Sequence, residues 1–396
     1  MKPADYCSPA FLEMLMRRHA PTRGIRVERV RPLDLDSSSS ILSALTAGTS
    51  GQPVGHFGLE VQLRADGQPR TERLVLKLKP HGREISTMLA GLAQANGGKL
   101  AAIYPRFQAL TGFEHTHWRE LQAYAQPDPS GLLPQVWASY ADPTTDTYLL
   151  LLEYLDESRT VELLNSVMQP ERWTDAHIRA ALTQVAAWHA AHLAPTLAAQ
   201  VNYGLDVPSA NFMQQLAPLW SALLGNAAAH CPALYSPARV ARLQQAIAHI
   251  PTYWQRLAQH PKTLVHNDLN PRNTCFKRAA DGQLRFCAYD WELATYHLPQ
   301  YDVVELLAFV LDADRYHLRP TYLEHYRREL HARTGQFGDA ALFREGFELA
   351  ALDFGLHRLG MYMMAHSLSP YPYLPRVVDS FFDTIKELEV APLARV

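Results

Sequence analysis

The sequence is poor in features that mark several classes of protein. Its four cysteines lie far apart without a CxxC spacing, at Cys7, Cys231, Cys275 and Cys287. Such usage favours free thiols in a reducing cytoplasm over a disulfide framework or a zinc site. No apolar run approaches the roughly 18 residues of a transmembrane helix. The acidic residues near the N-terminus do not fit a secretory signal, so we expect a cytoplasmic protein without a membrane partner.

An excess of charge of one sign is also missing. The 37 lysines and arginines nearly balance the 39 aspartates and glutamates, which leaves a formal net charge of −2. This balance gives no electrostatic reason to expect a nucleic-acid partner. With 396 residues, of which 47% are hydrophobic, the chain can build one large domain or two ordinary ones. The composition does not predict the oligomeric state.

The hydrophobic pattern changes near residue 155. Residues 27–152 read mainly as strands, with a helical stretch at 85–124 and a hairpin turn at Asp66-Gly67. After residue 156 helical spacing dominates, as in the face formed by Ile178, Leu182, Val185, His189 and His192, for which Thr174 or Asp175 is the expected cap. We predict an α+β protein with a strand-rich lobe at 1–154 and a larger helical lobe at 155–396. The two histidines are interpreted as hydrogen-bonded core residues.

Polar residues gather in the segment LVHNDLNPRN, residues 264–273. Phosphoryl transfer needs a carboxylate that orients the acceptor hydroxyl, ligands for magnesium, and positive charge on the phosphates. The spacing His-x-Asp-x-x-x-x-Asn places His266, Asp268 and Asn273 in one loop. A hairpin with an Asp-Gly turn then leads to Asp290, whose carboxylate could share Mg²⁺ with Asn273. The alternative is that these side chains only cap turns.

This segment resembles the catalytic loop of the aminoglycoside phosphotransferase and choline kinase group. The typical loop of these small-molecule kinases reads His-Gly-Asp-Leu-His-Pro-x-Asn, and here Asn267, Asn270 and Arg272 depart from it. The resemblance implies a bilobal protein-kinase-like fold and transfer of phosphate from ATP, or GTP, to a hydroxyl of a small molecule with Mg²⁺. An antibiotic, another natural product, an amino alcohol and a sugar are all open as the acceptor. Asp268 would be the catalytic base, and His266 would support the loop.

The same resemblance implies a set of nucleotide-binding residues. In ERLVLKLKP, Lys77 and Lys79 lie on one strand face because side chains alternate. Lys77 would contact the phosphates, and Glu120 would reach this lysine alone and orient it. The backbone of Glu153 and Leu155 would bind adenine. The alternatives are solvated lysines, an exposed helical glutamate and an ordinary buried strand.

A glycine-rich phosphate loop is missing from the sequence. The serine run at residues 37–40 lies where the resembled family has this loop. Amides and hydroxyls at Ser38 and Ser39 could bind phosphates there, although a solvated turn is an equal alternative.

Two aspartates compete for the role of second metal ligand. Asp353 belongs to a literal Asp-Phe-Gly, but its surroundings have helical spacing, so we expect it to face solvent or a local partner and predict Asp290 instead. Asp302 and Glu305 are interpreted as a capping box that opens the next helix. The short segment between Asp290 and that helix favours a small-molecule acceptor over a protein. The alternative function is a nucleotide-binding pseudokinase that acts as a regulatory partner.

Overall fold

The computed structural model describes residues 3–35, 54–194 and 207–388. Its N-terminal part is built on a five-stranded antiparallel sheet with the order β1-β2-β3-β5-β4. The strands are β1 (Arg26–Leu33), β2 (Gly55–Ala65), β3 (Gln68–Leu78), β4 (Val136–Asp142) and β5 (Thr147–Glu153). The helices of this part are α1 (Pro3–Tyr6), α2 (Pro9–His19), α4 (Gly82–Asn96), α5 (Gly98–Phe107) and α6 (Thr116–Tyr124).

The β2–β3 hairpin turns where the sequence predicts. Asp66 and Gly67 have φ angles of 54° and 79°, and the strands pair from Ala65 and Gln68 onward. Two positive φ angles in a two-residue loop match the twist of the flanking strands, and Asp-Gly adopts them readily. This tight turn fixes the register of β3, and therefore the face on which its lysines lie.

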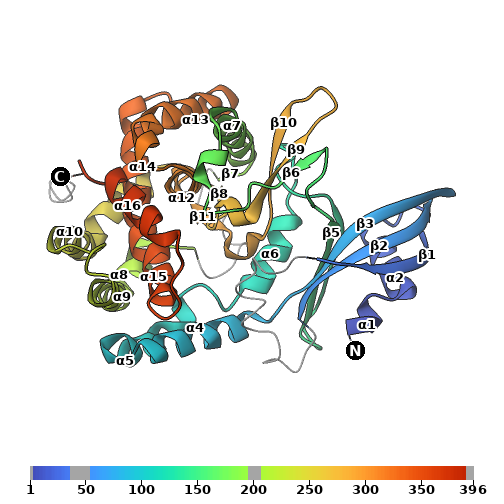
Figure 1. Cartoon of the computed structure of the whole chain (residues 1–396), viewed down its shortest axis with the longest axis horizontal. Helices are drawn as coiled ribbons and strands as arrows, with labels where there is room; N and C mark the ends of the chain where they lie inside the picture. Colours follow the sequence, from blue (N-terminus) through green and yellow to red (C-terminus); the bar gives the residue numbers. More distant parts are fainter. Residues whose placement is uncertain (1–2, 36–53, 195–206, 389–396) are drawn as a thin grey trace.

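One face of the sheet packs on α2 and the other faces the rest of the chain (Figure 1). Leu74, Leu76 and Leu78 of β3 are buried in the core shared with α2. The alternation of side chains therefore turns Lys77 to the opposite face, toward α6, which lies between the sheet and the helical part (Figure 1).

The C-terminal part is mainly helical. Its helices are α7 (Asp175–Ala191), α8 (Ala210–Gln215), α9 (Ala217–His230), α10 (Pro237–Ala248), α11 (Ile250–Gln259), α12 (Gln300–Val310), α13 (Arg319–Thr334), α14 (Ala340–Phe354), α15 (Gly360–His366) and α16 (Leu374–Thr384). Two small sheets, ordered β10-β9-β6 and β11-β8-β7, complete it. Their strands are β6 (Val161–Glu162), β7 (Leu193–Ala194), β8 (Lys262–Val265), β9 (Thr274–Arg278), β10 (Leu284–Ala288) and β11 (Thr295–His297).

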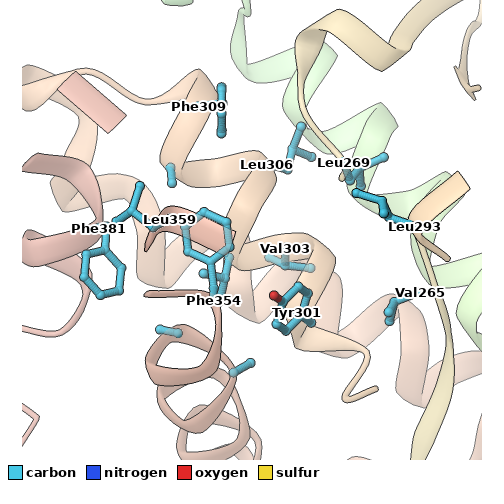
Figure 2. Close-up of a cluster of buried hydrophobic side chains, with 14 of the residues drawn as sticks. Val265, Leu269, Leu293, Tyr301, Val303, Leu306, Phe309, Phe354, Leu359 and Phe381 are labelled. Atoms are coloured by element: carbon cyan, nitrogen blue, oxygen red, sulfur yellow. The ribbon is translucent and has the colours of Figure 1, made fainter. Parts of the chain in front are cut away.

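The helical part has a continuous apolar core around α12. Figure 2 shows Val303, Leu306 and Phe309 of α12 beside Leu269 and side chains of α14 and α16. At Gly355 a Cβ atom would lie 2.2 Å from the Phe381 ring, so glycine is required for close packing at this position.

The structure confirms the predicted α+β architecture, with an antiparallel sheet lobe and a helical part. Helix α7 begins at Asp175 after the N-cap Thr174, as expected. The division at residues 1–154 and 155–396 stays a prediction. No helix in the described ranges is long and apolar enough to cross a membrane.

Candidate active site

The segment that follows β8 forms a tight loop. Asn267 has a φ of 61°, a left-handed conformation in which asparagine is among the few favoured residues besides glycine. This backbone explains why asparagine can stand where the resembled loop has glycine. The Asn267 side chain also donates a hydrogen bond to the carbonyl of Leu293 at 2.9 Å, which ties the loop to the segment after β10.

Asp302 anchors this loop from α12. Its carboxylate accepts hydrogen bonds from the backbone amides of His266 at 2.8 Å and Asn267 at 2.9 Å, and lies 3.1 Å from His189 Nε2. Burial opposes the ionisation of Asp302, but the hydrogen bond and charge of His189 outweigh it, so its pKa is lowered.

The prediction that Asp302 and Glu305 form a capping box is wrong, because α12 begins at Gln300 and both acids are buried inside the helix. The interpretation of His189 as a hydrogen-bonded core residue is confirmed.

His266 joins the loop to the end of β10. Its Nε2 lies 2.9 Å from the carbonyl oxygen of Tyr289, and its ring packs on Trp291 with centroids 4.5 Å apart. The ring is buried, and its other nitrogen, Nδ1, makes no hydrogen bond within the described residues. This position suits the predicted supporting role rather than a direct role in proton transfer.

Asp268 lies at the centre of a polar cluster and is 17% exposed. One carboxylate oxygen accepts hydrogen bonds from Arg358 at 2.7 Å, from Asn270 at 3.1 Å and from the Tyr362 hydroxyl. The other accepts one from Asn273 Nδ2 at 2.9 Å. Burial opposes ionisation, but the positive charge of Arg358 outweighs it and lowers the pKa of Asp268. The group is therefore an ionised carboxylate near neutral pH.

The β9–β10 hairpin brings Asp290 back to the loop, as the sequence predicts. The amide of Tyr289 donates a hydrogen bond to the carbonyl of Asn273 at 2.9 Å. Asp290 itself has a left-handed φ of 68°, and its carboxylate lies 2.5 Å from Lys77 Nζ. The two loops that carry the proposed metal ligands are thus joined directly through their backbones.

Glu120 contacts both lysines at the C-terminal end of β3. Lys77 lies 2.7 Å from one of its oxygens, and Lys79 bonds the other. The expectation that Glu120 reaches only one lysine is therefore wrong. The two lysines differ in their other partner, since Lys77 pairs with Asp290 whereas Lys79 pairs with Glu292 at 2.9 Å.

Burial and neighbouring charges both shift the pKa values of the groups in this cluster. Burial opposes protonation of Lys77, but Asp290 and Glu120 outweigh it and hold its pKa well above the ordinary value. His56 lies opposite Lys77 on β2, and burial together with the charge of Lys77 lowers the pKa of His56 to about 4. His56 is thus an uncharged imidazole in a cluster dominated by fixed charges.

The donor set suits a hard divalent cation. Carboxylate oxygens of Glu120, Asp290 and Glu292 lie within 4.8 Å of one another, and the predicted ligand Asn273 stands in the adjoining loop. When all groups are ionised, these three carboxylates and the two lysines have a net charge of −1. Burial raises the pKa of Glu292, which favours its neutral form. Oxygen-only ligands and local negative charge fit Mg²⁺. Glu292 was not foreseen from the sequence.

Residues 60–337 match the sequence model of the phosphotransferase enzyme family, APH. The chain belongs to this family. A search of curated proteins found no match for the phosphotransferase.

Several solved structures are similar to this phosphotransferase over most of its length. Ethanolamine kinase of Plasmodium vivax is 10% identical, with 90% of this chain and 80% of that chain covered and a TM-score of 0.45. The GDP complex of aminoglycoside 2'-phosphotransferase-IIIa is 13% identical, with 96% and 100% covered and a TM-score of 0.44. A microcompartment-associated aminopropanol kinase is 12% identical, with 92% and 93% covered and a TM-score of 0.42.

The predicted adenine contacts of the phosphotransferase lie at the end of β5. The amide of Glu153 already donates to the carbonyl of Gln135 at 3.0 Å, and its side chain accepts from the Gln135 amide at 2.6 Å. Leu155 lies just beyond the strand and is only partly buried. The roles of both residues stay predictions. Ser38 and Ser39 lie outside the described residues.

Asp353 has its hydrogen-bond partners outside these loops. Its carboxylate accepts a hydrogen bond from Trp254 Nε1 at 3.2 Å and lies 3.0 Å from His297 Nε2. It is fully buried, so the expectation of a solvent-facing or local position is wrong. Its partners lie 99 and 56 residues away in the sequence, which helical spacing alone could not indicate.

Sequence reasoning also missed Arg358 as a partner of Asp268. The only local signal was the four-residue spacing of Arg358 and Tyr362, which places both on one helical face. Nothing in the sequence relates that face to a loop 90 residues earlier.

Proposed function

We propose that the protein is a Mg²⁺-dependent kinase that transfers the γ-phosphate of ATP, or GTP, to a hydroxyl of a small molecule. One observation carries the proposal. The proposed base, the two proposed metal ligands and the phosphate-binding lysine form one connected cluster. Asn273 donates a hydrogen bond to Asp268, and its backbone is bonded to that of Tyr289, the neighbour of Asp290. Asp290 in turn pairs with Lys77. Phosphoryl transfer needs a carboxylate that orients the acceptor hydroxyl, oxygen ligands for a metal ion, and a cation that binds the phosphates.

Each residue has a separate task in this proposal. Asp268 orients the acceptor hydroxyl and accepts its proton, for which its lowered pKa keeps it ionised. Lys77, positioned by Glu120, binds the nucleotide phosphates. Asn273 and Asp290 would hold Mg²⁺, which would supply positive charge against the transferring phosphate. Catalysis then rests mainly on positioning and electrostatics.

The surroundings of the site support a small acceptor. Only the short segments η5 (Trp291–Leu293) and β11 (Thr295–His297) lie between Asp290 and α12. This leaves little chain for the peptide-binding segment that a protein kinase uses. All four cysteines are free thiols, which supports the proposed cytoplasmic location.

The test is Mg²⁺-dependent ATP turnover by the full chain, with and without a library of hydroxylated metabolites. We expect an acceptor to stimulate turnover in the wild type and in a control variant, Asp281→Asn, at the exposed turn of the β9–β10 hairpin. Asp268→Asn should lose that stimulation. Nucleotide binding without acceptor-stimulated turnover in any of the three proteins would instead indicate the pseudokinase alternative.

A further inference from the structure

Two arginines from separate elements flank the proposed base. Arg358 lies in the π-helical turn η7 (Gly355–Leu359) and donates to Asp268 at 2.7 Å. Arg272 lies in η4 (Pro271–Asn273), where it donates to Asn270 Oδ1 at 3.0 Å. Both guanidinium groups lie over the ring of Tyr362, at 5.8 Å for Arg272 and 5.1 Å for Arg358. A hydroxyl that reaches Asp268 therefore approaches two positive charges.

The acids of this cluster do not balance the two arginines. Asp268 is ionised, but burial and the neighbouring charge of Asp268 raise the pKa of Glu305 to about 8. Glu305 is thus mainly neutral at pH 7 and is bound through the Tyr362 hydroxyl at 3.1 Å. Arg358 pairs with Asp268, whereas Arg272 bonds Asn270 and the Tyr373 hydroxyl and forms no ion pair within the described residues.

A buried donor in the same cluster has no partner. Arg358 Nε makes no hydrogen bond within the described part of the chain, although the side chain is only 7% exposed. A buried guanidinium donor left unpaired is destabilising, so such donors normally meet an acceptor. The π-helical turn that carries Arg358 interrupts the path from α14 to α15, and such turns are frequent at functional sites.

We propose that the acceptor carries an anionic group, a carboxylate or a phosphate, which Arg272 and Arg358 bind while Asp268 holds the hydroxyl. The planar guanidinium fork matches both anions and can bind them through two hydrogen bonds. A cationic acceptor would meet repulsion from the same two groups. This inference rests on the proposed function and names its substrate class.

The kinetic test compares sugars that differ in charge: glucose, glucosamine, glucuronate and glucose 6-phosphate. We expect kcat/KM of the wild type to be at least about tenfold higher for glucuronate or for glucose 6-phosphate than for glucose or glucosamine. The comparison of these two anions shows whether the site recognises a carboxylate or a phosphate. Arg272→Gln should bring this ratio toward one through a higher KM, and Arg272→Lys should keep part of it. The matched control Arg278→Gln, at an exposed end of β9, should keep all of it. Equal or better use of glucosamine or glucose by the wild type would overturn the inference and leave the proposed function standing.

A binding test does not need turnover. The melting temperature is measured against inorganic phosphate and acetate at constant ionic strength, since a ligand that binds only the folded state raises it. We expect a saturable rise with one of the anions in Lys77→Met, which lacks the proposed contact to the nucleotide phosphates, and none in the double variant Lys77→Met/Arg272→Gln. Arg272→Lys, which should retain part of the rise, controls for a fold that fails without this side chain. A rise kept by the double variant, or absent from Lys77→Met, would refute the anion site.

Discussion

Removing either lysine at the C-terminal end of β3 should impair a different property of the protein, although both contact Glu120. Lys77 is 12% exposed and points to Asp290 at the proposed phosphate site. Lys79 is fully buried between Glu120 and Glu292. We therefore expect Lys77→Met to damage turnover and Lys79→Met to damage stability.

The magnitudes follow from burial. Removing Lys79 leaves two carboxylates of low exposure facing one fewer cation, and breaking a buried ion pair from one side costs about 3–5 kcal/mol of unfolding free energy. Removing Lys77 withdraws one charged contact to the transferring phosphate, and loss of one such donor lowers kcat by about 10²–10³. The double variant Lys79→Met/Glu292→Gln should recover part of the lost stability, because it also removes one of the unpaired charges.

Urea unfolding and Mg²⁺-dependent turnover are measured on both single variants and on the double variant. The reasoning is refuted if Lys79→Met keeps wild-type stability and loses more turnover than Lys77→Met. That result would make Lys79 the phosphate contact. Equal losses of turnover at equal stability would mean that it makes no difference to function whether a lysine pairs with Asp290 or with Glu292.

The remaining predictions concern four acids. Asp302→Asn should lower the free energy of unfolding by about 1.5–3 kcal/mol in urea unfolding, because the loop amides lose a charged acceptor; an unchanged midpoint would contradict this. The folded-state pKa of Glu305, about 8, exceeds the value of about 4.3 for an unfolded chain. Its stabilising contribution is therefore complete at low pH and is lost as the pH rises to about 8. The melting temperature of the wild type should fall relative to that of Glu305→Gln over that pH range. A constant difference between the two proteins would contradict this prediction. Asp290→Ala should abolish Mg²⁺-dependent turnover; Asp353→Ala should reduce stability and keep metal dependence, and the opposite pattern would overturn the assignment.

Local patterns predicted the parts of the site that local geometry determines. Strand alternation placed Lys77 and Lys79 on one face, and the Asp-Gly turn predicted the hairpin that returns Asp290 to the loop of Asn273. Both features depend on neighbours in the sequence or on a single tight turn. The family resemblance supplied the roles, which the geometry alone does not assign.

The contacts that were missed join distant segments. Asp302 matched the capping-box pattern, but its carboxylate instead binds amides 35 and 36 residues earlier. Arg358 reaches Asp268 across 90 residues, through a π-helical turn that has no signature in the sequence. Glu120 bonds two lysines from the end of β3, and α6 also packs against the segment after β10, so its position depends on tertiary structure.

The central claim is that Asp268 is the base of a phosphoryl transfer to a hydroxyl. The most direct measurement is phosphate transfer from ATP to the identified acceptor, together with nucleotide affinity, in the wild type, Asp268→Asn and the control Asp281→Asn. A positioned base contributes about 10²–10⁴ in rate, so Asp268→Asn should lose at least about a hundredfold in kcat with nearly unchanged nucleotide affinity. Near-normal transfer by Asp268→Asn would contradict the claim.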